Sequence, residues 1–330
     1  MRKIILTALC CCALSSVFAS TAFAQELIVG GQAVGIQISL DGVMVAGVAA
    51  VQTPDGGRSP AADAGIKEGD FITAVGGREV ESAAAFIEAV GALGGECADV
   101  TVLRGDDTVH IPVQPVKSAD GRWLMGIWLR DSISGIGTVT FCDPETGTFG
   151  ALGHSVSDGE AGCRMPIREG SITDAEIVSV VPGASGTPGE LNGCADMNTV
   201  KGSIEHNTEN GIYGKALVRL GSRVLETGNI MPGKASIVCT VKGRCEQEYS
   251  VDINRVYRDA DGTHVMLTVT DRELLACTGG IVQGMSGSPI IQNEKIVGAV
   301  THVFVNQPQK GYGISIQDML CAAEAEELAA

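Results

Sequence analysis

The sequence predicts a mainly β protein with two domains. The chain has 330 residues, which is long enough for two domains. It contains 44 Gly but only 7 Phe, 4 Tyr and 2 Trp, a balance that favours many turns and the packing of small residues. After residue 117, short alternating or apolar runs recur between turn residues, and about a dozen such runs indicate strands of a barrel or of paired barrels.

The first 24 residues have the pattern of a secretory signal peptide. A short basic start at Arg2 and Lys3 precedes an apolar run over residues 4–18, and the segment ends in the small-x-small site Ala22-Phe23-Ala24. The alternative is an uncleaved membrane anchor, but this apolar run is short for a helix that spans a membrane. We therefore expect an exported protein.

Charge and cysteine content exclude several classes of partner. Without the first 24 residues, 21 Lys and Arg stand against 39 Asp and Glu, so the net charge is −18 (21 − 39). Such a surface repels nucleic acid and anionic lipid. Eight cysteines remain, none in a Cys-x-x-Cys pair, and no histidine cluster has zinc spacing, so we expect no metal and no cofactor. Most of these cysteines are expected as small core residues, with one or two disulfides possible.

Residues 25–116 form the first predicted domain. Ser82 is a suitable N-cap for a helix with an apolar face, and Gly76-Gly77 closes a hairpin after a strand. The elements expected after an initial glycine loop and strand are a helical turn at 60–64, a strand at 71–75, a helix at 82–93 and strands at 98–103 and 108–113.

This order of elements resembles a PDZ domain, and the stretch AGIKEGDFITAVGG supports most of the resemblance. In PDZ domains, backbone N–H groups of a loop hold the terminal carboxylate of a peptide ligand, which adds itself as an extra strand. The resemblance places this loop at residues 30–36, where Gly31, Gly35 and Ile36 are the candidate peptide-binding residues. It places the groove between residues 36–39 and the 82–93 helix. The alternative is that these glycines only turn the chain.

The stretch GMSGSP, residues 284–289, is the strongest chemical signal in the chain. A serine hydroxyl needs a neighbouring base to become a nucleophile, and the oxyanion that forms needs N–H donors. Glycines on both sides of Ser286 permit backbone conformations that a Cβ would forbid. We expect Ser286 as nucleophile and the N–H groups of Gly284 and Ser286 as oxyanion hole. The alternative is an ordinary tight turn between strands.

This hexapeptide resembles the Gly-x-Ser-Gly-Gly-Pro signature of chymotrypsin-like serine proteases, with Ser288 where a second glycine usually stands. The resemblance implies that residues 117–330 form a double β-barrel serine protease domain after the PDZ domain. It places the primary substrate pocket at Gly280, Thr301, His302 and Val303. A small neutral floor at Gly280 argues against a preference for basic substrate side chains.

Of the five histidines, His154 is the best candidate for the general base. It lies at a predicted strand end between Gly153 and Ser155, whereas the others lie in strands, in a polar loop or near the expected pocket. The acid that orients the base is less clear from the residues. The carboxylates available are Asp271, Asp158, Glu205 and Glu209, and a carboxylate at a strand end is usually a turn former.

The whole order, from the signal segment through the PDZ-like module and FGALGH to TGGIVQGMSGSPIIQNEKIVGAVTHVF, resembles the stage IV sporulation protein B peptidases of endospore-forming bacteria. The resemblance covers nearly all of the chain after residue 24. It implies a triad of Ser286, His154 and Asp271, although the short spacing from Asp271 to Ser286 differs from chymotrypsin-like enzymes.

The same resemblance implies a role in spore formation. Members of this family are exported into the space between the forespore and mother-cell membranes and cleave themselves near the N-terminus. They also cleave a membrane-embedded regulatory protein that restrains an intramembrane metalloprotease, which then releases a late sigma factor. The alternative is a non-catalytic scaffold that binds peptides through the PDZ domain alone.

Overall fold

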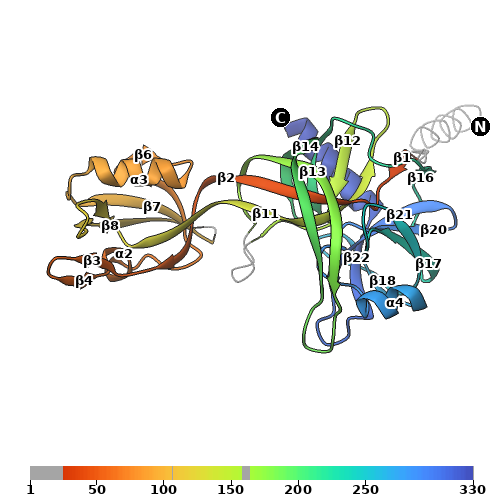
Figure 1. The fold of residues 1–330 in the computed structure, drawn as a ribbon. Coiled ribbons are helices and arrows are strands. Elements are labelled where there is room, and N and C mark those ends of the chain that lie inside the picture. The colour runs from red at the N-terminus through yellow and green to blue at the C-terminus, as the bar shows by residue number, and fades with distance from the viewer. Residues whose placement is uncertain (1–24, 106, 158–163, 330) are drawn as a thin grey trace, which may run out of the picture.

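The computed structural model describes residues 25–105, 107–157 and 164–329. It shows a smaller and a larger lobe joined by two long strands, β2 and β11 (Figure 1). The predicted signal peptide lies outside the described residues. Within the part of the chain that is described, no helix is both long and apolar enough to cross a membrane.

The larger lobe contains two closed barrels, as expected for the double β-barrel fold. In the first, each strand pairs with the next and the last returns to the first, in the order β2, β11, β12, β15, β14, β13. Their bounds are β2 Ala33–Val48, β11 Ile127–Cys142, β12 Thr148–Ala151, β13 Ile167–Val181, β14 Glu190–Thr208 and β15 Gly211–Ala216. β1 (Glu26–Val29) pairs with β11 and with β16 (Val224–Glu226) at the edge of this barrel.

The second barrel closes in the order β17, β18, β19, β22, β21, β20. Its core is aliphatic, with residues such as Ile237, Val251 and Leu267 fully buried. The bounds are β17 Gly233–Cys239, β18 Gln247–Arg258, β19 Thr263–Val269, α4 Arg272–Thr278, β20 Pro289–Gln292, β21 Lys295–Val303, β22 Lys310–Ser315 and α5 Ile316–Ala329. The chain ends in the helix α5, which packs on β21 and β22.

The smaller lobe is the PDZ domain. Its helix α3 begins after Ser82, whose side chain accepts a hydrogen bond from the Ala85 N–H at 3.2 Å, as the cap signal predicted. The expected helical turn, helix and strands are confirmed. The bounds are β3 Val51–Thr53, β4 Gly56–Arg58, α2 Pro60–Ala64, β5 Phe71–Val75, β6 Arg78–Glu79, α3 Ala83–Ala92, β7 Ala98–Arg104, β8 Asp107–Val113, β9 Val116–Lys117 and β10 Trp123–Leu124.

The connection between the lobes differs from the predicted order of a PDZ domain at 25–116 followed by a peptidase domain at 117–330. The chain starts in the larger lobe, because residues 33–40 of β2 pair with β11 and β13 of the first barrel. β2 then runs out to the smaller lobe, and β11 returns beside it (Figure 1). The PDZ domain is thus an insertion into the first barrel, and the barrel pairings are too distant in sequence to be visible as local pattern.

The cysteines also depart from expectation. Of the seven in the described residues, only Cys142 and Cys239 are buried, and the others are exposed. All seven are free thiols, so no disulfide occurs within the described part of the chain. Burial raises the pKa of the Cys239 thiol to about 12, which suits a packing role. In the described part of the chain, no group of three or more His, Cys, Asp and Glu side chains is arranged so that it could hold a metal ion.

Candidate active site

A cavity of about 470 Å³ lies where the two barrels meet, and it contains the candidate nucleophile and base. His154 reaches it from the loop after β12, and Ser286 from the loop before β20. Thr301, His302 and Val303, at the end of β21, line the same cavity. Gly284 lines it too, so the structure brings together six residues that the sequence selected for the active site from distant positions.

The loop that holds Ser286 is built from left-handed glycines and rests directly on the first barrel. Gly284 and Gly287 have φ angles of 96° and 93°, which favour glycine. A Cβ on Gly287 would lie 2.0 Å from the Thr138 carbonyl oxygen of β11, so only glycine allows this approach. The serine loop can therefore dock on β11 only because residue 287 has no side chain.

Thr138 ties this loop to the first barrel by two hydrogen bonds. Its hydroxyl donates to the Gly284 carbonyl at 2.9 Å, and its N–H donates to the Ser286 carbonyl at 3.1 Å. The side chain is buried, with 1% of its surface exposed. The backbone carbonyls on either side of Met285 are thus turned toward β11 and away from the cavity.

The N–H groups of Gly284 and Ser286 are available for an oxyanion. Neither donates a hydrogen bond to an acceptor in the described residues, whereas the N–H groups of Met285, Gly287 and Ser288 all do. Unpaired N–H groups beside a nucleophile can stabilise the negative charge of a tetrahedral intermediate. Both predicted oxyanion donors are therefore without an acceptor among the described residues.

His154 is presented by a second left-handed turn. Leu152 and Gly153 have φ angles of 69° and 71°, and a positive φ is rare for leucine. The Leu152 N–H donates to the Thr138 carbonyl at 3.2 Å, so the same residue of β11 supports both the serine loop and the histidine loop. A Cβ on Gly153 would lie 3.1 Å from the Thr301 methyl group, which brings the histidine loop close to β21.

The environment of His154 suits a general base. Nδ1 lies 2.8 Å from the Ser155 carbonyl oxygen, and a carbonyl can only accept, so Nδ1 carries the proton and Nε2 is left as the basic nitrogen. Burial, with a smaller contribution from His302, lowers the pKa of His154 to about 4, against an opposing effect of the Ser155 carbonyl. The imidazole is therefore neutral, and able to accept a proton, at neutral pH.

The Ser286 hydroxyl is in a resting orientation. Its Oγ donates a hydrogen bond to the Thr301 carbonyl oxygen at 2.7 Å. A nucleophilic serine must instead donate to the base, so rotation about its Cα–Cβ bond is needed to direct the proton to His154 Nε2.

Asp271 lies elsewhere in the structure and does not line the cavity. It is the N-cap of α4: one carboxylate oxygen accepts from the N–H groups of Glu273 and Leu274, at 2.9 and 3.1 Å. The other oxygen accepts from the Ser250 N–H at 3.3 Å. In this conformation the Ser155 carbonyl, not Asp271, contacts His154 Nδ1. The role of Asp271 as triad acid stays a prediction, and Asp158 lies outside the described residues.

The walls of the cavity are mainly aliphatic. No Lys, Arg, Asp or Glu is among the described residues that line it. Gly280, the predicted floor, does not line it, because this glycine is packed so closely that a Cβ would lie 2.0 Å from the Pro308 carbonyl oxygen. The sequence reasoning missed several apolar wall residues from both barrels and from the β13–β14 loop, including Ile36, Ile133, Ile136, Pro188, Ile281, Val282 and Val305.

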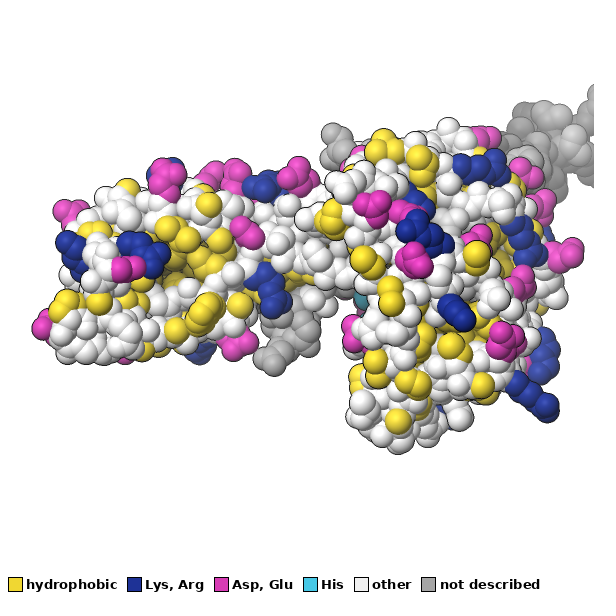
Figure 2. Space-filling view, viewed as in Figure 1, with side chains coloured by type: hydrophobic (Ala, Val, Ile, Leu, Met, Phe, Trp, Pro, Cys, Tyr) yellow, Lys and Arg dark blue, Asp and Glu magenta, His cyan; other side chains and the backbone are white. Residues whose placement is uncertain are grey.

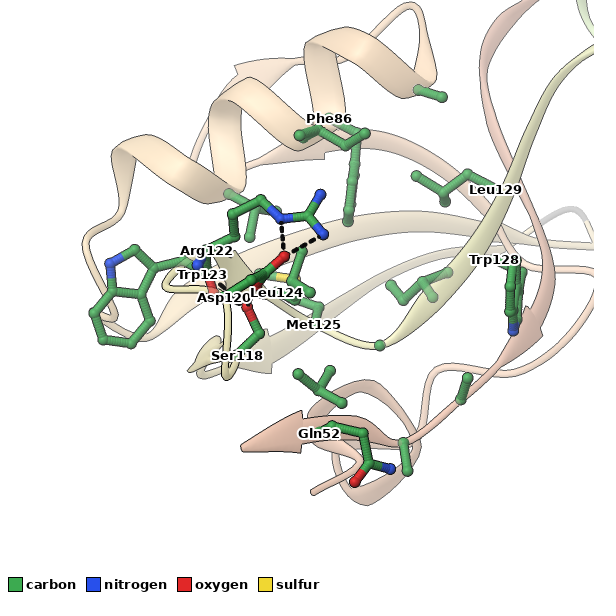
Figure 3. A pocket seen from close by; sticks show the side chains of 18 of the residues that line it. Gln52, Phe86, Ser118, Asp120, Arg122, Trp123, Leu124, Met125, Trp128 and Leu129 are labelled. Atoms are coloured by element: carbon green, nitrogen blue, oxygen red, sulfur yellow. Dashed lines mark hydrogen bonds and ion pairs between the residues drawn. The ribbon is translucent and has the colours of Figure 1, made fainter. Parts of the chain in front are cut away.

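A second, larger cavity lies in the PDZ lobe. This peptide groove, as we call it, measures about 690 Å³ and runs between α3 and residues 118–129. Figure 3 shows Phe86 of α3 on one side and Met125 and Leu129 on the other. In the space-filling view, hydrophobic side chains gather below α3 on this lobe (Figure 2). At one end, Arg122 and Asp120 form an exposed ion pair of 2.6 Å.

The helix wall of the groove is the predicted one, since α3 lines it, but the loop and the strand that the sequence suggested are wrong. Gly31, Gly35 and Ile36 lie in the larger lobe, where Gly35 pairs with Ile136 of β11 and Ile36 lines the catalytic cavity. The strand beside α3 is instead the start of β11, which pairs with β2 on one edge and has no strand partner among the described residues on the other. The glycine-containing stretch WLMGIWL, residues 123–129, is the sequence signal from which this strand of the groove could have been predicted.

Two closed barrels with a serine and a neutral histidine in the cavity between them, and a PDZ lobe, define a serine peptidase with a peptide-binding domain. The pattern of the PDZ domain matches residues 57–104. The pattern of the SpoIVB peptidase S55 family matches residues 121–320, and the chain belongs to this family.

Similar structures are also known. The active form of the Rv3671c protease from M. tuberculosis has 12% sequence identity and a TM-score of 0.37, and the match covers 58% of this chain and 74% of that chain. The thermostable serine protease AL20 from an extremophilic microorganism has 11% identity and a TM-score of 0.33, with 58% and 91% covered. No curated protein matches the chain.

Proposed function

We propose that this serine peptidase is an exported endopeptidase of the sporulation stage IV B type, with Ser286 as nucleophile and His154 as general base. The observation that carries the catalytic part is that both side chains line one cavity beside the unpaired N–H groups of Gly284 and Ser286. Membership of the S55 family and the signal-like N-terminal segment support the rest.

In the proposed reaction, a substrate peptide enters the cavity and the Ser286 hydroxyl turns from Thr301 to His154. Oγ attacks the scissile carbonyl carbon while its proton passes to His154 Nε2, and the oxyanion accepts from the N–H groups of Gly284 and Ser286. The imidazolium then gives this proton to the leaving amine, which leaves an acyl-enzyme. Water, deprotonated by the same nitrogen, attacks the ester carbonyl and releases the acid product and the free serine.

The PDZ lobe would select the protein that is cut. The free edge of β11 lies beside the apolar wall of α3, which is the arrangement that lets an extended peptide add a strand and insert alternate side chains. We propose that a peptide ligand binds in this groove. The substrate would be the membrane-bound regulatory protein of an intramembrane protease complex, in the space between the forespore and mother-cell membranes.

Self-processing gives a direct test of the proposal. The N-termini of the exported wild-type chain and of a Ser286→Ala variant would be mapped by mass spectrometry. We expect the wild type to show a second terminus beyond the signal-cleavage site, and the variant to show only the signal-cleavage product.

Ser288→Ala is the matched control, because Ser288 is buried in the same turn and its hydroxyl donates to the Met285 carbonyl at 2.6 Å. This variant should process like the wild type. Identical termini in the wild type and Ser286→Ala, together with tight peptide binding, would favour the non-catalytic scaffold instead.

A further inference from the structure

A second imidazole lies against the catalytic base. The ring centroid of His302 is 4.5 Å from that of His154, and the two planes are inclined by 35°. Both rings line the cavity. His302 was expected only as part of the substrate pocket, and a tilted ring in contact with the base is a different kind of contact, since it acts on the enzyme and not on the substrate.

We propose that His302 is a positioning residue for His154: its ring covers one face of the imidazole and holds it with Nδ1 at the Ser155 carbonyl and Nε2 free for Ser286. This inference rests on the proposed role of His154. Side chains are fixed by packing and by hydrogen bonds, and among the described residues the Ser155 carbonyl is the one hydrogen-bond partner of the His154 ring. No carboxylate of the described residues lines the cavity to supply a second restraint.

The position of His302 on β21 explains how it reaches the base. The register of β21 is irregular between Val300 and Val303, and in this stretch Thr301 is buried, with 7% of its surface exposed, whereas His302 is exposed. His302 therefore points outward into the cavity, next to the loop whose Gly153 packs near the Thr301 methyl group. Two consecutive residues of β21 therefore lie against the histidine loop. Thr301 lies beside Gly153 of this loop, and His302 contacts the imidazole ring of His154.

The contact also requires that the second ring stay uncharged. His154 and His302 are the two titratable side chains among the described residues that line the cavity, apart from hydroxyl groups. His302 is more exposed than His154, but its partial burial in the cavity lowers its pKa in the same direction, so both rings are neutral at neutral pH. When His154 takes the proton from Ser286, the neutral ring beside it adds no positive charge. An aromatic ring without charge could therefore replace His302, whereas a cation could not.

The test compares His302→Phe, His302→Ala and His302→Lys in the full chain, with kcat and KM measured separately on a peptide substrate. We expect Phe to keep kcat within about threefold of the wild type, because the ring contact is retained. Ala should lower kcat by roughly 10- to 100-fold with little change in KM, because the base is misplaced. Lys should be slower than Ala, because a charge beside the ring disfavours the imidazolium.

Three controls separate the possible causes. His264→Ala removes a histidine near the start of β19 that stacks on Tyr257, with ring centroids 5.5 Å apart, and should leave kcat unchanged because His264 does not line the cavity. Ser286→Ala and His154→Ala should be inactive, and activity in either would contradict the proposed function whatever His302 does. The thermal midpoint of each variant identifies any that fails to fold.

Four outcomes would overturn the proposal. These are full activity in His302→Ala, a kcat for His302→Phe as low as that of the Ala variant, a change confined to KM in both, and a kcat for His302→Lys at or above that of His302→Ala. The third would make His302 a wall of the substrate pocket only. If His302→Ala unfolds, the comparison of Phe with Lys still decides, because the proposal predicts a large difference in kcat between them and equal values would overturn it.

Discussion

The catalytic cavity and the peptide groove differ in how their residues are held, although the strand β11 contributes to both. The cavity is built on loops with left-handed residues, such as Leu152 and Gly287, and its candidate catalytic groups are imidazoles, a hydroxyl and N–H groups that have no acceptor among the described residues. The groove is built on the regular helix α3 and the start of β11, and its wall is mainly apolar. Cleavage needs groups in unusual positions, whereas peptide binding needs only an open strand edge beside an apolar face.

The largest expected effect would separate the two sites completely. His154→Ala removes the base and should lower kcat by a factor of about 10⁴ or more, while the peptide groove keeps its affinity. Peptide hydrolysis measures the first, and binding of peptides with free C-termini to the full chain measures the second. Equal loss of both would show that the sites are not separate.

A second variant destabilises the loop that holds Ser286. Gly287→Ala should be strongly destabilising, by about 3 kcal/mol, because the added Cβ meets the Thr138 carbonyl and the φ of 93° disfavours alanine. Activity should be lost and peptide binding retained. Gly243→Ala is the control, since its φ of 63° is also positive but no atom lies within 4 Å of the added Cβ. Its thermal midpoint should fall much less, and similar falls in both would contradict this account of the loop.

On the PDZ side, Ile87→Asp should weaken peptide binding by roughly 10-fold or more without a folding cost, because Ile87 lines the groove and is 56% exposed. Hydrolysis of short peptides should not change. Val178→Asp, on a β13 residue that is 71% exposed, is the matched control and should leave binding intact. Unaltered binding in Ile87→Asp would place the ligand elsewhere.

A smaller effect tests the strand that the two sites share. Thr138→Val keeps the size of the side chain but removes the hydroxyl that donates to the Gly284 carbonyl, and should lower kcat by about 10-fold through the loss of one hydrogen bond. Thr173→Val, at another buried threonine of the first barrel, should leave kcat unchanged. A kcat equal to that of the wild type in Thr138→Val would mean that its backbone hydrogen bonds alone position the loop.

The dependence on pH is the mildest test. Because the pKa of His154 lies near 4 in the fold, kcat/KM should stay level on acidification until about pH 5 and fall below it. The unfolded chain takes up this proton near pH 6.5, so between pH 6.5 and 4 it binds more protons than the folded chain. Stability should therefore decrease as the pH falls through this window, by on the order of 3 kcal/mol from this group. An acid limb near pH 6.5 would contradict the burial of the base.

Local features of the sequence predicted the local structure well. The helix cap at Ser82, the helix after it and the glycine turn around Ser286 are each predicted from a few neighbouring residues. The structure contains the cap, the helix and the turn. The same local signal explains the position of Asp271, since an Asp before the helical stretch RELLACT is also an N-cap pattern, and the structure uses it as one.

Long-range pairing could not be predicted in the same way. Nothing near Gly35 in the sequence indicates that it pairs with Ile136, about a hundred residues away and beyond the whole PDZ domain. The peptide groove was therefore sought beside β2, whereas β11 lies next to α3. The ring contact between His302 and His154 depends on the same kind of distant contact, between the two barrels.

The central claim is that the Ser286 hydroxyl is activated in the cavity between the barrels. Labelling of the full chain with a fluorophosphonate probe, followed by mass spectrometry of the labelled peptide, tests it most directly. The account predicts that the probe is found on Ser286, is absent from Ser286→Ala and from His154→Ala, and is retained by Ser288→Ala. Labelling of a different residue, or undiminished labelling of Ser286 in His154→Ala, would contradict it.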